Sequence, residues 1–491
     1  MFKTQKSVVY NKGIRKKRIK VMEDLRRDRK RLMRTILALA WPTMLEQFLQ
    51  TIVIYINTAM IGAIGQEASA AVGITSTTTW LLSGPLYALG IAATANIARA
   101  IGENNRDHIK SYISQSFQIG LVLSIVVTVL TLALSPVLPG LLGAEEAIQK
   151  DASVYFALIN LPYSLNMITI VFGAILRGSG DTRTPMMVNL VLNIIHVILN
   201  FFFIYPSRTI TFLGLSLEMF GFGWGVFGAA LSTAISYAVG GIMMFIAFRK
   251  NSVLFSRDDK LFIKDKEARN SILKMAVPLT LSRLISAGGH VVFTSLVAGL
   301  GTTVFAAHSI ALTAEEAFYI PGFGMQSAAI SLTGHAVGER NRDELKKITR
   351  MLAFISVSLM VITGGLLFIF SREMMTLFIS DADVIALGSS ALKIVAVSEP
   401  IFGLAIIMEG IFNGAGDTRH PLIFSTLTMW LVRILGTWLC INVFSLGLNA
   451  VWLCMVGDNS IRGLLLFILF ARTDLLELSE KKKKTPLAEA S

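Results

Sequence analysis

The sequence predicts an all-α polytopic membrane protein, with twelve transmembrane helices in two six-helix lobes related as parallel repeats. Three observations predict this class. The 491 residues are 53% hydrophobic and only 16% charged, whereas a soluble domain has about 25% charged residues. Apolar runs follow one another along the chain, and short motifs recur at one fixed offset. The composition excludes a disordered chain, a secreted disulfide scaffold and most soluble enzymes.

Each expected helix is an apolar run long enough to cross a membrane, which takes about 20 residues. Twelve runs reach this length, at 33–58, 68–97, 112–139, 154–176, 186–206, 225–248, 271–300, 303–333, 349–371, 388–412, 421–444 and 448–471. Backbone polar groups find no water in lipid and must be satisfied within the segment. The runs are therefore expected to be helices rather than strands.

The positive charge is concentrated at the N-terminus. Residues 1–34 contain 14 Lys and Arg against three acidic residues. A nucleic-acid-binding arm is one interpretation, but an apolar run follows at once, which favours a lipid-facing cytoplasmic tail. With this tail inside, 38 Lys and Arg lie on cytoplasmic segments and three on external loops. We therefore expect a multi-pass plasma-membrane protein with both termini cytoplasmic and no nucleic-acid partner.

Three motifs recur at one spacing, which we call the repeat offset and define by the step from Pro42 to Pro278. The same step leads from AIGENNRD (100–107) to AVGERNRD (336–343), and from GSGDTR (178–183) to GAGDTR (414–419). Because six helices return the chain to its starting side, the second copy enters the membrane as the first does, and the two copies enclose a central cleft. The expected parts are a basic tail (1–32), a first lobe (33–248), a cytoplasmic linker (249–270), a second lobe (271–471) and a C-terminal tail (472–491).

The repeated motifs have physical interpretations. Pro42 and Pro278 remove a backbone N–H from the first helix of each half, which is either a hinge or a purely structural kink. The two Gly-Asp-Thr-Arg motifs are expected to be turns, with glycine at positive φ, Asp as a helix cap and proline early in the next helix.

The combined pattern resembles the MATE family (multidrug and toxic compound extrusion) over about residues 33–471. The resemblance rests on Trp41-Pro42, YINTAMIGAIG (55–65), FYIPGFGMQSAA (318–329), GSGDTRTP and GAGDTRHP. It implies a V-shaped pair of six-helix lobes. It also implies secondary antiport, with organic, often cationic, compounds expelled in exchange for H⁺ or Na⁺.

The chain departs from the family pattern where many bacterial members carry two carboxylates. Asn57 stands in place of an Asp of the first helix, and Asn200 in place of an Asp near the end of the fifth. An Asn side chain does not titrate, so another acid must carry any coupling. His196, one helical turn before Asn200, is a minor candidate for a proton relay.

Charged residues inside the membrane are costly, so each one is a candidate functional residue. The candidates for ion coupling or substrate binding are Glu46, Glu315, Glu316, Glu399, Glu409, Arg283 and Arg433. Glu399 is the leading candidate, and at least one of Glu315 and Glu316 is expected to face the cleft. Arg283 is left with two possible partners, Glu46 or an acid of the second half. Asp458 and Arg462, four residues apart, are expected to form a structural pair.

These residues predict a transporter rather than an enzyme, with no cofactor and no metal site. No nucleophile–base set, HExxH motif or phosphate loop is found in the sequence, and no CxxC or Cys/His cluster. The partners are expected to be a small, cationic molecule, H⁺ or Na⁺, and the lipid bilayer, with the protein as a monomer. The alternative is a lipid or lipid-linked oligosaccharide flippase of the related superfamily, which usually has a more basic cavity.

Overall fold

The computed structural model describes residues 29–477 apart from residues 213–214 and 257–258. Most of the basic tail expected at 1–32 and of the C-terminal tail therefore lies outside the described residues. The first half comprises α2 (Arg29–Gly62), α3 (Gln66–Gly102), α4 (Arg106–Leu134), α5 (Leu138–Leu141), α6 (Glu146–Asn160), α7 (Tyr163–Gly178), α8 (Arg183–Ile204), β1 (Pro206–Phe212), β2 (Leu215–Phe222) and α9 (Gly225–Lys250). The second half comprises α10 (Lys266–Ala298), α11 (Thr302–Gly338), α12 (Arg342–Ile369), α13 (Ser371–Thr376), α14 (Ala382–Gly414), α15 (Arg419–Leu427), the π-helical segment η1 (Thr428–Ile434), α16 (Leu435–Asn442) and α17 (Leu448–Arg472).

The described helices account for most of the expected membrane spans. Ten are long and apolar enough to cross a membrane, and eleven if α6 and α7, which are bent by 47° at their junction, form one span. The expected run 303–333 corresponds to α11, which has 37 residues but is not in that set. The prediction of a helical membrane protein is confirmed, and the count of twelve spans stays a prediction.

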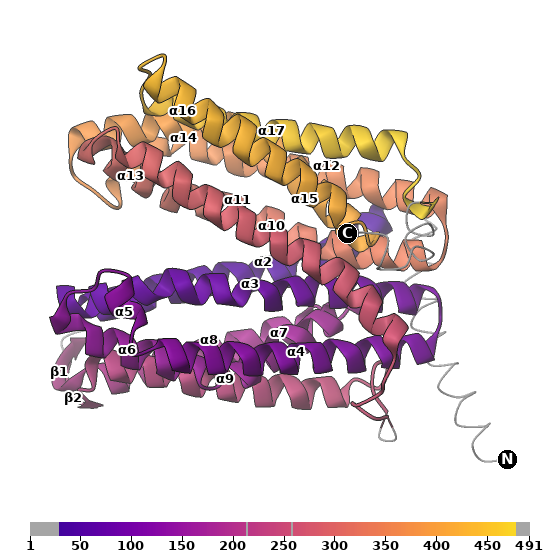
Figure 1. Ribbon diagram of the computed structural model, residues 1–491, viewed down its shortest axis with the longest axis horizontal. Helices are drawn as coiled ribbons and strands as arrows, with labels where there is room; N and C mark the ends of the chain where they lie inside the picture. Colours follow the sequence, from indigo (N-terminus) through magenta and orange to yellow (C-terminus); the bar gives the residue numbers. More distant parts are fainter. Residues whose placement is uncertain (1–28, 213–214, 257–258, 478–491) are drawn as a thin grey trace.

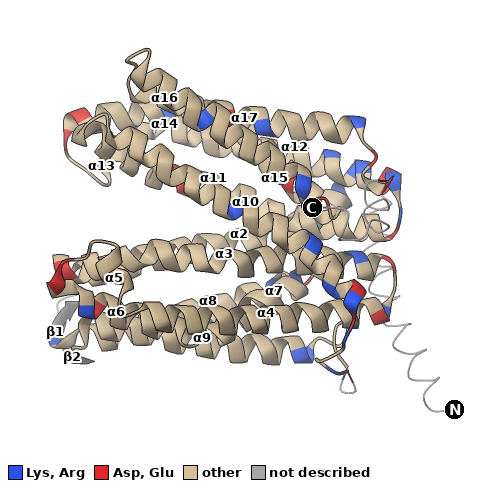
Figure 2. Ribbon diagram, viewed as in Figure 1, with Lys and Arg blue, Asp and Glu red and all other residues tan. Residues whose placement is uncertain are grey.

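The helices gather into two groups that follow the two halves of the sequence. Figure 1 shows α3 to α9 on one side and α10 to α17 on the other. The groups meet where α3 packs on α10 and α11, and where α2 packs on α11. Most Lys and Arg residues lie at one end of the helices, at the right in Figure 2, and few lie along their middle. We call this the basic end.

The repeat extends to the backbone. Asn104 and Arg340, separated by the repeat offset, have positive φ angles of 57° and 55°. Gly102 and Gly338, separated by the same offset, meet where α3 and α11 end, and a Cβ built on Gly338 would lie 2.8 Å from the Cα of Gly102. Only glycine allows two helices this close. Equivalent turns of the two halves therefore contact one another at the basic end.

The expected Gly-Asp-Thr-Arg turns are confirmed. Gly180 and Gly416 have φ angles of 87° and 83°. The Asp181 carboxylate accepts a hydrogen bond from the Thr184 backbone N–H at 3.0 Å, and that of Asp417 accepts one from the Arg419 N–H at 3.2 Å. Each turn orients the helix that follows, α8 or α15.

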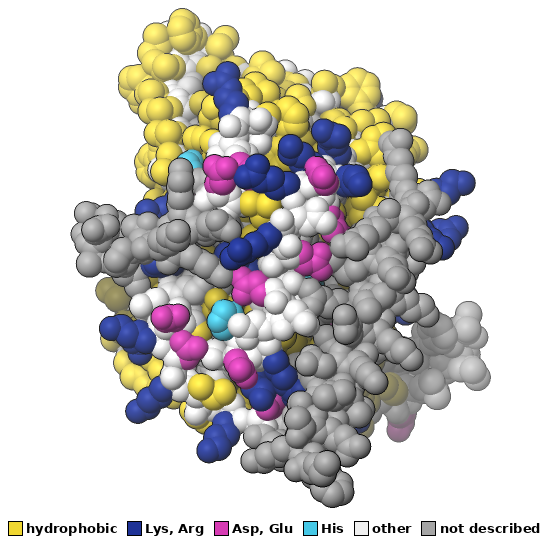
Figure 3. Space-filling model, turned by 90° about the vertical axis from the view of Figure 1, so that its right-hand side faces the viewer, with side chains coloured by type: hydrophobic (Ala, Val, Ile, Leu, Met, Phe, Trp, Pro, Cys, Tyr) yellow, Lys and Arg dark blue, Asp and Glu magenta, His cyan; other side chains and the backbone are white. Residues whose placement is uncertain are grey.

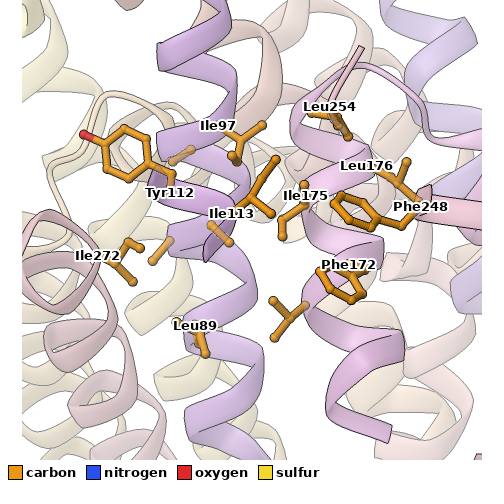
Figure 4. Close-up of a cluster of buried hydrophobic side chains, with 14 of the residues drawn as sticks. Leu89, Ile97, Tyr112, Ile113, Phe172, Ile175, Leu176, Phe248, Leu254 and Ile272 are labelled. Carbon is orange, nitrogen blue, oxygen red and sulfur yellow. The ribbon is translucent and has the colours of Figure 1, made fainter. Parts of the chain in front are cut away.

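One buried core is formed mainly by the first half and also includes residues of α10 and α11, and another is formed mainly by the second half and also includes residues of α2. In the first half, aromatic rings gather where α4, α7 and α9 meet, and Figure 4 shows Phe172 and Phe248 within this cluster. Their rings stack with centroids 4.3 Å apart, and Phe117 stacks on Phe172 at 5.7 Å. The positions equivalent to Phe117 and Phe172 in the second half are Ala353 and Met408, so this stack is not repeated there.

The expectation of a purely helical chain is wrong at one place. Strands β1 and β2 form an antiparallel hairpin between α8 and α9, at the end of the molecule opposite the basic end. Alternating apolar and polar residues, as in Leu-Ser-Leu-Glu (215–218), are typical of a strand. The hairpin lies between two of the expected apolar runs, where water can satisfy the open edges of a two-stranded sheet.

Candidate functional site

A cavity of about 660 Å³, with charged and apolar residues in its lining, lies between the two halves. Residues of α2, α3, α7, α10, α11, α14, α15, η1 and α17 line it. Its charged residues and histidine are Glu46, Arg177, Arg283, His290, Glu315, Glu316, Glu409, Arg433, Asp458 and Arg462. The cavity brings together six of the ten residues expected to bind ions or substrate, and leaves out Asn57, Asn200, His196 and Glu399.

Glu46 is the ionisable centre of the first half. Its carboxylate lies 3.3 Å from an Arg177 guanidinium nitrogen and accepts a hydrogen bond from Asn189 Nδ2 at 2.9 Å. Arg177 lies just beyond the expected run 154–176, but α7 extends to Gly178 and the Arg177 side chain lines the cavity. The pair neutralises most of the charge on this side.

Arg283 does not make the pair with Glu46 that the sequence left open. Its guanidinium lies 5.7 Å from the centre of the Tyr87 ring, and Glu409 is the carboxylate whose charge acts on it. Its stem packs on Gly84, where a Cβ would lie 3.9 Å from the Arg283 side chain. The residue therefore crosses from α10 towards α3 and spans the boundary between the halves.

In the second half, Arg433 is the buried cation. Its Nε lies 2.8 Å from the Asp458 carboxylate, and a second nitrogen donates to Asn459 Oδ1 at 3.2 Å. The expected pair between Asp458 and Arg462 is wrong, because Arg462 instead donates to Asn459 Oδ1 at 3.0 Å. Arg433 reaches Asp458 across the contact between η1 and α17, which sequence spacing along one helix cannot indicate.

Three cavity carboxylates have no cation partner within ion-pair distance among the described residues: Glu315, Glu316 and Glu409. Glu315 is 3% exposed, whereas Glu316 is half-buried. Both line the cavity, one position apart on α11. The sequence led us to expect this of at least one of them.

Glu399 lies behind this cavity. It is completely buried, and neither carboxylate oxygen has a hydrogen-bond partner among the described residues. A Cβ on Gly364 would lie 2.9 Å from the Glu399 Cβ, so α12 crosses close over this residue. The negative charges of Glu315 and Glu399 interact electrostatically. Tyr319, which lines the cavity, interacts electrostatically with both carboxylates.

Asn57 and Asn200 form a pair of their own away from the cavity. Asn200 Nδ2 donates to Asn57 Oδ1 at 2.8 Å, joining α8 to α2. His196 Nε2 lies 3.1 Å from the Thr233 hydroxyl, across the contact between α8 and α9. The side chains that replace the expected carboxylates are thus joined by a neutral hydrogen bond.

Pro42 and Pro278 lie inside α2 and α10, which run through them as continuous helices. Beside Pro42, the Thr43 hydroxyl donates to the backbone carbonyl of Gly324 at 2.9 Å and ties α2 to α11. Sequence reasoning missed a second proline pair at the repeat offset, Pro85 in α3 and Pro321 in α11. Whether Pro42 and Pro278 act as hinges stays a prediction.

The charged groups of the cavity are almost balanced in sign. Four guanidinium groups line it, those of Arg177, Arg283, Arg433 and Arg462, against five carboxylates. Sequence reasoning found only Arg283 and Arg433 at midspan. After the pairs of Glu46 with Arg177 and Asp458 with Arg433, three carboxylates and two guanidinium groups remain.

The family model MatE matches the chain twice, at residues 42–202 and 278–439, and its two starts are separated by the repeat offset. A probable multidrug resistance protein, NorM of Thermotoga maritima, is 28% identical over 89% of this chain and 91% of its own. The multidrug export protein MepA of Staphylococcus aureus is 24% identical over 79% of this chain and 82% of its own. The solved outward-facing structure of a multidrug resistance MATE transporter superposes with a TM-score of 0.83 at 22% identity, covering 94% of this chain and 98% of the other.

Proposed function

The chain belongs to the MatE family of membrane transporters, which confirms the predictions of a transporter rather than an enzyme and of the MATE family. We propose that it is a secondary active antiporter, which exports organic cations or drugs in exchange for H⁺ or Na⁺ by alternating access. One observation carries this proposal. The central cavity lies between the two halves and holds three carboxylates without an ion-pair partner among the described residues.

Substrate binding would use these carboxylates. Glu315, Glu316 and Glu409 supply negative charge, and Trp80, Tyr87 and Tyr319 supply aromatic faces in the same cavity. Cations bind such faces through the ring quadrupole, and the low dielectric of the cavity strengthens the carboxylate attraction. A cavity of about 660 Å³ is within the usual range for a drug-sized ligand.

Ion coupling would use Glu399 together with Glu315. A buried carboxylate without a partner is costly when it is charged, so it is occupied by a proton or a cation in at least part of the cycle. Two acids whose charges act on one another do not both stay ionised at low cost. Binding of H⁺ or Na⁺ to this pair from outside would then disfavour binding of a substrate cation in the adjoining cavity. This competition would couple ion entry to substrate export.

The division of the chain follows the same scheme. A first lobe at 33–248 and a second at 271–471 would rock about the contacts of α2 and α3 with α10 and α11. The linker 249–270 joins them on the cytoplasmic side, and both termini lie in the cytoplasm. Pro42 and Pro278 would act as hinges, and the protein would function as a monomer.

The proposal is tested with the purified protein in proteoliposomes loaded with ethidium. Imposed pH and Na⁺ gradients are compared, and one of them is expected to drive efflux. Glu399→Gln is expected to abolish ion-driven efflux with normal expression, whereas Glu373→Gln, at an exposed position outside the cavity, leaves it unchanged. Transport under neither gradient would contradict antiport, and normal transport by Glu399→Gln would contradict the role of that residue.

The alternative function is that of a lipid or lipid-linked oligosaccharide flippase. The four guanidinium groups of the cavity favour this alternative, because guanidinium groups bind phosphate-bearing headgroups well. The two functions differ in their cargo. Movement of a fluorescent anionic lipid between leaflets, with no gradient-driven ethidium efflux, would favour the flippase.

A further inference from the structure

A second cavity opens at the basic end, between α12 and α17. Its volume is also about 660 Å³. The charged residues that line it are Arg342, Lys346, Arg350, Arg472 and Asp474, and its apolar wall comprises Leu345, Ala353, Met408, Phe467, Phe470 and Leu475. Arg342 begins α12 and Arg472 ends α17, so the cavity lies where two membrane helices leave the apolar layer. We call it the α12–α17 pocket.

The corresponding place in the first half is filled by the chain itself. Residues 259–263, in the segment that follows α9, lie over α4. Asp259 lies 2.8 Å from Lys110 and 3.6 Å from Arg106, and the ring of Phe262 packs edge-on against Phe117 with centroids 5.7 Å apart. The Ser114 hydroxyl donates to the backbone carbonyl of Leu261 at 2.9 Å. A carboxylate thus covers the basic residues while an apolar side chain covers the helix beside them.

At the repeat offset, the first-half residues at this site correspond to residues that line the α12–α17 pocket. Arg106 and Lys110 correspond to Arg342 and Lys346, Ser114 to Arg350, Phe117 to Ala353, and Phe172 to Met408. The basic pair is kept, a third basic residue is added, and two aromatic rings are replaced by smaller side chains. The residues described after α17, 473–477, contain no aromatic side chain that could take the place of Phe262. The loss of the Phe117 ring leaves the space.

The charges of this pocket are only partly satisfied. Arg342 pairs with Asp474 at 2.5 Å and Glu477 at 2.9 Å. Lys346, Arg350 and Arg472 are exposed and form no ion pair among the described residues. Basic pockets between membrane helices at the membrane surface are suited to anionic headgroups. The residues after the pocket, 478–491, contain four lysines against two glutamates, so their charge does not suit them as the cover.

We propose that the α12–α17 pocket binds one anionic phospholipid of the surrounding bilayer. The phosphate lies on Lys346, Arg350 and Arg472, and an acyl chain follows Ala353, Phe467 and Phe470. Phe467 is 42% exposed, and Leu464, one turn deeper, is 54% exposed, so the apolar wall runs on into the lipid-facing surface of α17. Figure 3, viewed onto the basic end, shows basic side chains at the rim of an apolar flank.

The lipid is a bound partner and not the cargo, so the proposal stands apart from the transport function. It requires only that the pocket lies at the membrane surface. The proposed orientation adds that the lipid belongs to the cytoplasmic leaflet, where anionic lipids attract basic residues.

The test uses the full-length protein and counts retained lipids by native mass spectrometry during titration with phosphatidylglycerol or phosphatidylcholine of the same acyl chains. The wild type is expected to keep one phosphatidylglycerol preferentially. Lys346→Gln/Arg350→Gln/Arg472→Gln is expected to weaken that first binding step on the order of a hundredfold, since each basic residue near an anionic lipid contributes about fivefold. Lys260→Gln/Lys264→Gln/Arg269→Gln removes equal charge near the first half's filled site and is expected to leave it unchanged.

Ala353→Phe restores the bulk of Phe117 without changing any charge. It is expected to weaken the same binding step, and inorganic phosphate is expected not to compete, because the acyl chain shares the site. Equal retention by the pocket variants and the wild type would overturn the proposal, as would an equal loss in the control variant. A loss confined to glutamine variants of Lys481–Lys484 would overturn it as well, since the site would then be the C-terminal tail.

Discussion

Glu46 and Asn189 of the first half are hydrogen-bonded at 2.9 Å, and their equivalents at the repeat offset, Ser282 and Ser425, lie 3.2 Å apart. The two halves thus make the same contact between their first and fifth long helices with different chemistry. Only the first half carries an ionisable group there. A duplicated fold has kept its contacts and has changed the charges placed on them.

The second half has its own ionisable pair at another place. Arg433 and Asp458 lie 2.8 Å apart, whereas the residue equivalent to Arg433 in the first half is Val197. The two sides of the cavity therefore differ in where the charge is held.

The largest expected effect comes from removing the cation of the second half. Arg433→Ala leaves Asp458 buried without a partner and is expected to cost about 3–5 kcal/mol of unfolding free energy. Arg433→Val/Asp458→Asn, which copies Val197, is expected to recover most of this loss. Thermal unfolding of the detergent-purified protein measures both. Equal loss in both variants would show that shape, and not charge, decides the difference between the halves.

The next effect tests what the halves share. Gly338→Ala places a Cβ 2.2 Å from the Arg99 carbonyl oxygen and is expected to cost about 3 kcal/mol through overpacking. Gly102→Ala, its equivalent, is expected to match it. Gly73→Ala, with no atom within 4 Å of the new Cβ, is the control. A stable Gly338→Ala protein would contradict a close contact at the basic end.

A smaller effect is expected at the ionisable pair of the first half. Arg177→Asn, which copies its equivalent Asn413, leaves the buried Glu46 with Asn189 alone and is expected to cost about 2 kcal/mol. Glu46→Ser/Arg177→Asn makes this site resemble Ser282 and Asn413, and is expected to be more stable than the single variant. Denaturant or thermal unfolding measures the difference. A double variant less stable than Arg177→Asn would contradict the pairing.

The smallest effect concerns the start of the second half. Asp265 caps α10, and the hydrogen bond from the Ala268 backbone N–H, more than any other contact, lowers the pKa of its carboxyl. Because its pKa is lower when folded, its stabilising contribution is present above the unfolded pKa of about 3.9 and is lost as the pH falls through the folded value.

Asp265→Ala is expected to cost about 1 kcal/mol at neutral pH, and less in acid. Unfolding curves at neutral and acidic pH measure this convergence with the wild type. A constant difference at all pH values would contradict the charged cap.

Part of the site could be predicted because the free-energy cost of a charged residue in lipid depends only on that residue and its own apolar segment. Glu46, Glu315 and Glu409 stand out as charges within apolar runs, and the cavity does hold them. Arg177 was missed because it adjoins a turn, where a basic residue is ordinary. Asp458, the partner of Arg433, was missed because it lies on another helix. Residue spacing within one helix does not indicate contacts with other helices.

Hydropathy, charge bias and the repeat offset by themselves determined the class of this protein, its repeat and nearly all of its membrane helices, because the cost of apolar surface in water and of charge in lipid depends only on the residues of each segment. The tertiary structure alone decided the ion pairs, the hairpin and the difference between a filled site in the first half and an open one in the second. Those depend on which helices meet, and side chains far apart in the sequence set the distances there.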